Sequence, residues 1–233
     1  MGPVKASMES NGPGLIGLDI GATKTLGVLV DAEGKVLAQA REATEPGADG
    51  VIDTAAQVVA HLGGEAVACS IGVGIPGLVD HVDGMVQHAV NLGLNGDRLA
   101  LRALLEDRCG LPVYVENDVN AATLGAVSLS GIRDLVYLSI GTGLAAGIVI
   151  DGVLRRGATG AAGEIGHVPL DPAGELCRCG QRGCLETIAS GSALAVAWPS
   201  GDESPAQALF AAAALADPAA VAVPPFLPDT PEV

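Results

Sequence analysis

Aromatic and basic residues are scarce in this chain of 233 residues. Phe, Tyr and Trp together make up 2% of it, and 12 Lys and Arg stand against 27 Asp and Glu, which gives a formal net charge of −15. Proteins that bind single-stranded nucleic acid place aromatic side chains along a basic groove, and anionic membrane surfaces attract basic segments. The composition therefore predicts no direct nucleic-acid binding and no membrane binding.

Long apolar runs are also missing. No stretch approaches the roughly 18 apolar residues of a membrane span, and residues 1–14 hold no apolar run that could act as a secretory signal. We therefore expect a cytoplasmic protein. Hydrophobic residues still make up 49% of the chain against 17% charged residues, so there is enough apolar surface to build a folded core.

Strand and helix patterns alternate along the chain, which is typical of an α/β fold. After a polar leader at 1–13, the segment 15–37 predicts a strand, a Gly-rich turn and two further strands. The elements expected next are strands at 65–80 and 111–115 and helices at 55–62 and 98–110. Past Trp198, clustered prolines and one short helix pattern from about Pro205 predict an irregular tail at 199–233.

The chain contains an internal repeat. A shift of 120 positions lays residues 16–21 onto 136–141 and residues 27–31 onto 147–151, so a glycine-turn hairpin recurs in each half. Two buried hairpins can share Gly and Val by chance, and short matches carry a high false-positive risk. The alternative is duplication, which predicts two related lobes that each offer a backbone turn to one ligand in the cleft between them.

The two glycine turns suit a nucleotide triphosphate. Glycine lets main-chain N–H groups approach a phosphate, a Thr hydroxyl can donate to it, and an Asp carboxylate suits Mg²⁺. Either turn alone would be read as an ordinary hairpin turn. The residues concerned are Asp19, Gly21, Thr23 and Lys24 in the first turn and Gly141, Thr142 and Gly143 in the second.

The segment Glu116-Asn117-Asp118 directly follows a predicted strand. Polar side chains at the carboxyl end of a strand are well placed for ligand binding in α/β proteins. Phosphoryl transfer needs a base that takes the proton of the acceptor hydroxyl, and Asp118 is the candidate. The competing interpretation is that Asp118 caps the Ala-rich helix that follows, as Asn117 or Asn120 could also do.

A dense polar cluster follows in the second half. Three cysteines and one histidine match a closed tetrahedral zinc site, although the C-x-C pair is closer than the usual spacing. A redox pair is the alternative, but a thioredoxin-like pair would be C-x-x-C. The expected ligands are His167, Cys177, Cys179 and Cys184, and Glu164, His167 and Glu186 bring polar side chains to the same region.

Five motifs, in order, resemble the ROK family of sugar kinases and sugar-responsive repressors: DIGATK, ENDVNAA, SIGTGLAAG, GEIGH and CRCGQRGCLE. The similarity runs from about Leu15 to Gly191. It implies an actin-like, ribonuclease H-like fold with two lobes, which would account for the internal repeat. We expect an N-terminal lobe at 14–118 and a partial C-terminal lobe at 119–198.

The resemblance also implies roles for individual residues. By position, Asp118 resembles the catalytic base, and His167 resembles a residue that faces both zinc and sugar. The residues that resemble sugar ligands are Asn117, Glu164, His167 and Glu186, with Gly77 on a loop that lines the family's cleft. The two phosphate elements match the glycine turns above, and the structural zinc ligands match the Cys and His cluster.

The sequence departs from the family pattern in three ways. Ala22 and Ala145 stand where many members have Gly, which requires φ below zero at both positions. The leader is too short for the winged-helix DNA-binding domain of the repressors. A later block of the family, with a glycine pair at the adenosine, has no match, so we expect an incomplete second lobe with uncovered apolar faces.

The resulting expectation is an ATP- and Mg²⁺-dependent hexose kinase of the glucokinase type, acting at carbon 6, with a structural zinc ion. The alternative is a sugar-binding sensor or regulatory protein without turnover, because the adenosine element is not matched. The substrate would be a hexose or an N-acyl hexosamine. A homodimer is the oligomer to expect, since an incomplete lobe would need a partner surface.

Overall fold

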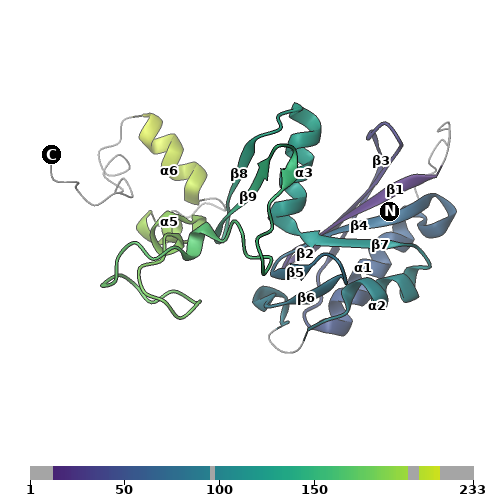
Figure 1. The fold of residues 1–233 in the computed structure, drawn as a ribbon, viewed down its shortest axis with the longest axis horizontal. Coiled ribbons are helices and arrows are strands. Elements are labelled where there is room, and N and C mark those ends of the chain that lie inside the picture. Colours follow the sequence, from purple (N-terminus) through teal and green to yellow (C-terminus); the bar gives the residue numbers. More distant parts are fainter. Residues whose placement is uncertain (1–12, 95–97, 199–204, 216–233) are drawn as a thin grey trace. The chain divides into compact units, whose positions relative to one another are not determined.

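The computed structural model describes residues 13–94, 98–198 and 205–215. It divides into two compact units, Met1–Ile132 and Arg133–Val233 (Figure 1). The expected boundary at residue 118 differs from this division because α3 (Asp118–Ser130) continues directly from a strand of the first unit and packs on that sheet. Most of the expected leader at 1–13 and most of the expected tail at 199–233 lie outside the described residues.

The first unit is built on a five-stranded sheet in the order β3-β2-β1-β4-β7. β1 is antiparallel to β2 and parallel to β4, and β4 is parallel to β7. The strands are β1 (Gly14–Ile20), β2 (Lys24–Val30), β3 (Val36–Ala43), β4 (Ala68–Ile75) and β7 (Val113–Asn117). A two-stranded ribbon, β5 (Leu78–Asp80) and β6 (Met85–Gln87), follows β4.

Helices cover both faces of this sheet (Figure 1). α1 (Ala48–Leu62) and α2 (Leu101–Cys109) lie on one face and α3 lies on the other. Gly27 lets α1 approach β2 closely, because a side chain at this position would collide with Val58. The two short 3₁₀ turns of this unit are η1 (Gly64–Ala66) and η2 (Val90–Leu92).

The helices predicted at 55–62 and 98–110 are both present, with different bounds. α1 begins at Ala48 rather than at residue 55, because Val51 and Ile52 extend its buried apolar face toward the N-terminus. α2 ends where its sequence predicts, at Gly110, which has the left-handed conformation that glycine adopts readily, with φ of 70°. The main hydrophobic core lies between these helices and the sheet.

The second unit has a three-stranded sheet in the order β10-β9-β8. Its strands are β8 (Leu135–Ile140), β9 (Leu144–Ile150) and β10 (Val153–Leu154). Its helical segments are η3 (Ile165–His167), α4 (Glu186–Ala189), α5 (Gly191–Ala197) and α6 (Pro205–Ala214), and α6 falls where the tail's short helix was expected. None of the described helices combines the length and apolar character needed to cross a bilayer.

The repeated strands have different surroundings in the two units. β1 is an inner strand between β2 and β4, whereas β8 pairs with β9 alone among the described strands. Side chains of β8 are accordingly exposed: Val136 is 60% and Leu138 is 54% exposed, while Leu18 is 4% exposed. β8 thus carries apolar side chains that are exposed in the described part of the chain.

The two glycine hairpins also differ in register. Ile20 pairs with Thr25, so four residues separate the paired ends, but Ile140 pairs with Leu144, which leaves three residues between them. Residues related by the shift of 120 are therefore not paired equivalently: Gly27 faces Leu18, and Gly147 faces Tyr137. The shorter turn of the second hairpin is the reason.

Candidate functional site

One edge of the first sheet collects the candidate residues of that unit. β1, β4 and β7 run parallel, so their carboxyl ends meet at the same edge, which is where α/β proteins bind ligands. Asp19 on β1 is in register with Gly74 on β4, and a Cβ at Gly74 would lie 3.5 Å from the Cα of Asp118. Asp19 and Asp118 therefore both lie on the face of the sheet that α3 covers, next to Gly74, which has no side chain.

Asn117, and not Asp118, caps α3. The Asn117 Oδ1 accepts hydrogen bonds from the main-chain N–H groups of Val119, at 3.0 Å, and Asn120, at 3.1 Å. Asp118 is the first residue of the helix, and its Oδ1 accepts from the N–H of Val119 at 2.9 Å. The capping alternative for Asp118 is therefore wrong, because the role belongs to its neighbour.

The carboxyl group of Asp118 is half-buried and has an altered acidity. Burial raises the pKa of Asp118, the Val119 N–H lowers it, and the negative charge of Asp19 raises it again. The balance is a pKa above the ordinary value for Asp. A raised pKa makes a carboxylate a better acceptor for the proton of a hydroxyl group at neutral pH.

The loop after β4 is joined to the cap of α3. Asn117 Nδ2 donates to the carbonyl oxygen of Gly77 at 3.2 Å, so two residues expected to bind sugar are in contact. Gly77 has φ of 102°, and a Cβ there would lie 2.7 Å from the carbonyl oxygen of Gln87. Only glycine suits this position, because the backbone conformation and the close approach both exclude a side chain.

The first glycine turn is closed by its own backbone. Gly21 N–H donates to the carbonyl oxygen of Lys24 at 2.9 Å, and the carbonyl oxygen of Thr23 accepts from the N–H of Thr44 at 3.3 Å. Among described non-glycine residues, positive φ occurs at His88 and Asp151, so Ala22 keeps φ below zero as the sequence required, and so does Ala145 in the second unit.

The second glycine turn is held from the start of α5. Its Gly141 N–H donates to the carbonyl oxygen of Gly143 at 3.1 Å. The Gly141 carbonyl oxygen accepts from the N–H of Gly191 at 2.7 Å, and the Thr142 carbonyl oxygen accepts from Ser192 Oγ at 2.7 Å. Sequence reasoning missed Gly191 and Ser192, although the Ser-Gly-Ser segment right after the cysteine cluster is a recognisable helix start.

The four expected zinc ligands lie together. One ligand atom from each of His167, Cys177, Cys179 and Cys184 lies within 4.8 Å of all the others. Cys177 Sγ is 3.6 Å from His167 Nδ1, and Cys179 Sγ is 3.5 Å from Cys184 Sγ. Ligands about 2.3 Å from a tetrahedral zinc ion lie about 3.8 Å from one another. The donor set and its spacing therefore fit Zn²⁺.

Thiol acidity in this cluster follows its burial. Burial raises the pKa of Cys177 to about 12 and also raises the pKa of Cys184. Main-chain N–H donation from Gln181 lowers the pKa of the exposed Cys179 to about 7. A bound zinc ion stabilises thiolates, so metal binding at this cluster would release protons from the buried thiols.

His167 presents its two ring nitrogens to different partners. Nδ1 faces the thiols and lies 3.5 Å from Glu186 Oε1, while Nε2 lies 3.8 Å from Glu164 Oε2. Glu186 Oε1 also accepts from Cys177 Sγ at 3.1 Å. The three polar residues expected to bind sugar in this unit therefore lie together, with the two glutamates beside the imidazole of His167, whose Nδ1 side would be occupied by the metal.

Comparison with known proteins places this arrangement in a family. The model of the ROK family matches residues 15–225. The chain belongs to the ROK family. It is 41% identical to a glucokinase from Streptomyces coelicolor over 184 residues, which cover 77% of this chain and 57% of that protein. The chain thus spans little more than half the length of this ROK relative.

Solved structures give the same result for the fold. A ROK family glucokinase from Streptomyces griseus, in complex with glucose and AMPPNP, superposes with a TM-score of 0.74 at 37% identity, covering 90% of this chain and 74% of that one. A ROK family transcriptional regulator, a homolog of the E. coli MLC protein, superposes with a TM-score of 0.79 at 31% identity, covering 92% and 59%. The chain has the actin-like α/β fold of ROK sugar kinases.

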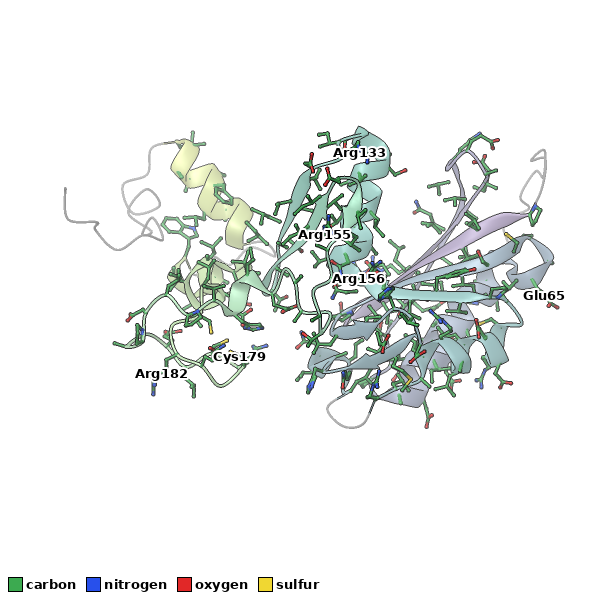
Figure 2. All side chains as sticks on the ribbon, in the orientation of Figure 1. Glu65, Arg133, Arg155, Arg156, Cys179 and Arg182 are labelled. Carbon is green, nitrogen blue, oxygen red and sulfur yellow. The ribbon has the colours of Figure 1, made fainter. Side chains whose placement is uncertain are left out.

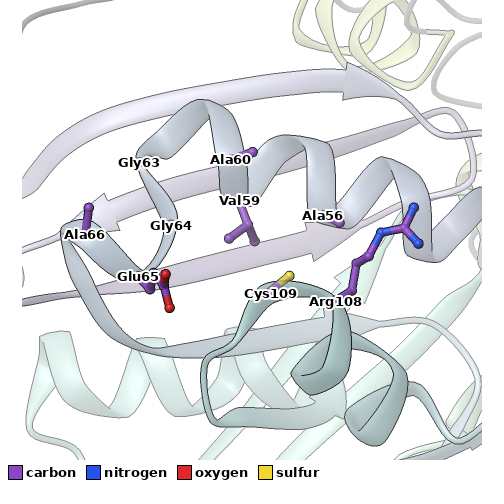
Figure 3. Close-up of a pocket in the computed structure, with 9 residues that line it drawn as sticks. All are labelled: Ala56, Val59, Ala60, Gly63, Gly64, Glu65, Ala66, Arg108 and Cys109. Atoms are coloured by element: carbon purple, nitrogen blue, oxygen red, sulfur yellow. The ribbon is translucent and has the colours of Figure 1, made fainter.

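This ROK protein also has a cavity in the first unit, away from the candidate site residues. A cavity of about 430 Å³ is lined by the ends of α1 and α2 and by η1, among them Glu65, Arg108 and Cys109 (Figure 3). It lies beside the first residues of β4, whereas Gly77 follows the end of β4 and Asn117 is the last residue of β7, so it is at the opposite edge of the sheet.

The arginines of the second unit do not form one basic patch. Arg182 lies with Cys179 on the cysteine loop, away from Arg155 and Arg156 (Figure 2). Arg182 donates to the carbonyl oxygen of Gly174 and Arg155 donates to that of Ile150. Local structure therefore uses part of the hydrogen-bonding capacity of both side chains.

Proposed function

We propose that this protein is an ATP- and Mg²⁺-dependent hexose kinase that phosphorylates the hydroxyl group at carbon 6. The observation that carries the proposal is the half-buried carboxyl group of Asp118, which does not cap its helix and lies beside Asp19 at the carboxyl edge of the sheet. The glucokinase relatives, including the structure with glucose and AMPPNP, support it.

Each unit supplies a different part of the reaction. In the first unit, Asp118 accepts the proton of the sugar hydroxyl, whose oxygen then attacks the γ-phosphorus while the bond to the oxygen of ADP breaks. Asp19 would hold Mg²⁺, which neutralises phosphate charge, and Asn117 with Gly77 would hold the sugar. In the second unit, Glu164, His167 and Glu186 would orient the sugar hydroxyls. The glycine turn of each unit would hold phosphates.

The test is a coupled assay of ADP release with glucose, mannose and N-acetylated hexosamines. Removal of a positioned general base costs roughly 10² to 10⁴ in rate, so we expect Asp118→Asn to lose at least about 100-fold in kcat. Asp107→Asn, on the exposed side of α2, is the matched control and should retain full activity. No turnover by the unmodified chain, or equal turnover in Asp118→Asn, would reject the proposal.

A sugar sensor without turnover is the second candidate. A ROK transcriptional regulator superposes on the chain as well as the Streptomyces griseus glucokinase does. For a sensor, glucose raises the melting temperature while AMPPNP has no effect, because only a ligand that binds the folded state stabilises it. Stabilisation by both ligands favours the kinase.

A further inference from the structure

We propose that Gly191 and Ser192 are positioning residues that orient the second glycine turn, so that the N–H groups of Thr142 and Gly143 form a binding nest for a polyphosphate. The proposal rests on the nucleotide-binding part of the proposed function and adds residues outside the turn. The contact that carries it is made entirely within the second unit, by the start of α5 against residues 141–143.

Two neighbouring peptide units of the turn are fixed by this contact. The Gly141 carbonyl oxygen accepts from Gly191 N–H and the Thr142 carbonyl oxygen accepts from Ser192 Oγ, both at 2.7 Å. In a planar trans peptide unit the C=O and the N–H of the next residue point in opposite directions. Both carbonyl groups point toward α5, so the N–H groups of Thr142 and Gly143 point away from it.

These two N–H groups are available to a ligand. Neither donates a hydrogen bond to any described residue, and residues 141–143 are exposed. The third N–H of the turn, on Gly141, is used within the turn by the carbonyl oxygen of Gly143. Successive main-chain N–H groups that face one direction form a concave site for anions, and phosphate oxygens are typical occupants.

Gly191 has a steric reason to be glycine. A Cβ at this position would lie 2.5 Å from the carbonyl oxygen of Gly141, closer than real Cβ contacts occur. Ser190 fixes the segment from the other side, because its side chain is buried and caps α5 by accepting from the N–H of Ala193 at 3.1 Å. The start of α5 is thus a rigid donor pair for the turn.

The first glycine turn has no counterpart to this contact among the described residues. There the carbonyl oxygen of Thr23 accepts from Thr44 N–H at a longer distance of 3.3 Å, and no side-chain hydroxyl donates to the turn. The Gly21 turn is preceded by β1, which is paired on both sides, whereas β8, the strand before the Gly141 turn, is paired on one side among the described strands. The conformation of the second turn therefore depends more on hydrogen bonds from residues outside the hairpin.

The test measures binding of inorganic tripolyphosphate to the full chain by NMR, with ¹⁵N-labelled Gly and Thr. In the unmodified chain we expect tripolyphosphate to shift the amide signals of Thr142 and Gly143. Ser192→Ala should weaken this binding about three- to tenfold, since one hydrogen bond is worth about 0.5–1.5 kcal/mol. It should also lower the backbone order parameters of residues 141–143, and Ser192→Thr should restore both properties.

Ser130→Ala is the matched control. Ser130 Oγ donates to the carbonyl oxygen of Ala126 at the same 2.7 Å but lies in the first unit, so its removal should leave tripolyphosphate binding and residues 141–143 unchanged. Gly191→Ala should impair the turn more than Ser192→Ala, with Gly125→Ala, which meets no atom within 4 Å, as its control. If Gly191→Ala does not fold, the tripolyphosphate binding of Ser192→Ala still tests whether the start of α5 orients the turn.

The outcomes separate this inference from the proposed function. If Ser192→Ala binds tripolyphosphate like Ser130→Ala, or if tripolyphosphate leaves the Thr142 and Gly143 signals of the unmodified chain in place, the nest is overturned even when hexose turnover is intact. If binding shifts these signals and weakens in Ser192→Ala while no hexose is phosphorylated, the nest stands and the kinase proposal fails.

Discussion

The two units of this protein carry related glycine hairpins but hold them in different ways. In the first unit the hairpin belongs to a five-stranded sheet with an extensive apolar core between the sheet, α1 and α2. In the second unit the sheet has three strands, the buried cluster around Leu194 and Leu209 is small, and a Cys and His cluster organises a long loop. Hydrophobic burial organises the first unit, whereas the second has a small buried cluster, polar contacts and a Cys and His cluster whose spacing fits a metal ion.

Metal removal should give the largest difference between the units. Structural zinc contributes about 10–16 kcal/mol in zinc-finger peptides, so Cys184→Ser or a strong chelator should unfold the second unit. Trp198, the chain's one Trp, lies in that unit, and its fluorescence should change while the first unit keeps a cooperative unfolding transition.

Elemental analysis accompanies this experiment. The folded chain should contain about one zinc per molecule, and Cys69→Ser, at an exposed cysteine of β4, should retain it. Less than about one metal per folded chain, or full metal content in Cys184→Ser, would contradict the assigned site.

A cavity in the apolar core should affect the first unit alone. Ile71 on β4 is fully buried, and Ile→Ala in a core costs about 2–5 kcal/mol. We expect Ile71→Ala to lower the free energy of unfolding of the first unit by this amount in urea melts, with zinc content unchanged. Leu129→Ala, at a side chain that is 92% exposed, should cost much less. Equal losses in the two variants would refute the assignment of the core.

The carboxyl pair of the first unit should make stability depend on pH. Because the pKa of Asp118 is higher in the folded chain than in the unfolded chain, the folded state binds more protons between these two values, and stability falls as pH rises through that range. Asp118→Asn should remove this loss, so its gain in unfolding free energy should be present at pH 7 and absent below about pH 4. A gain of the same size at both pH values would argue against the raised pKa.

The smallest expected effect is a difference in thermal stability between Gly→Ala variants of the two glycine turns. A Cβ at Gly141 meets no atom within 4 Å, whereas at Gly21 it would lie 3.2 Å from the carbonyl oxygen of Lys24. Gly→Ala at a compatible position stabilises by about 0.4–1 kcal/mol, so Gly141→Ala should leave thermal stability equal or slightly higher. Gly21→Ala should be the less stable of the two, and the reverse order in thermal melts would show that the turns are not packed as described.

Much of the local structure could be predicted from the sequence. The glycine hairpins, the glycine that ends α2 and the grouping of His167 with three cysteines follow from residue types at short spacing, because neighbouring residues restrict each other directly. The start of α1 was less predictable, since Ala48 joins the helix through packing on the sheet rather than through a strong cap.

Which residue caps α3 could not be predicted from the sequence. Three nearby polar residues could each cap the helix, namely Asn117, Asp118 and Asn120. The choice of Asn117 comes with its hydrogen bond to Gly77, which is 40 positions away. The register of Asp19 beside Gly74 brings Asp118 and Asp19 to one face of the sheet. Burial, and after it the negative charge of Asp19, raises the pKa of Asp118, and both depend on the tertiary structure.

The amino-acid sequence by itself determined the family, the duplicated hairpins and the metal-binding cluster, because these depend on residue types at near or repeated positions. Tertiary structure alone decided that α5 orients the turn of the second hairpin and that β8 remains an edge strand among the described strands. The physical reason is that peptide orientation and strand pairing depend on hydrogen bonds between residues far apart in the chain, whose partners no local pattern specifies.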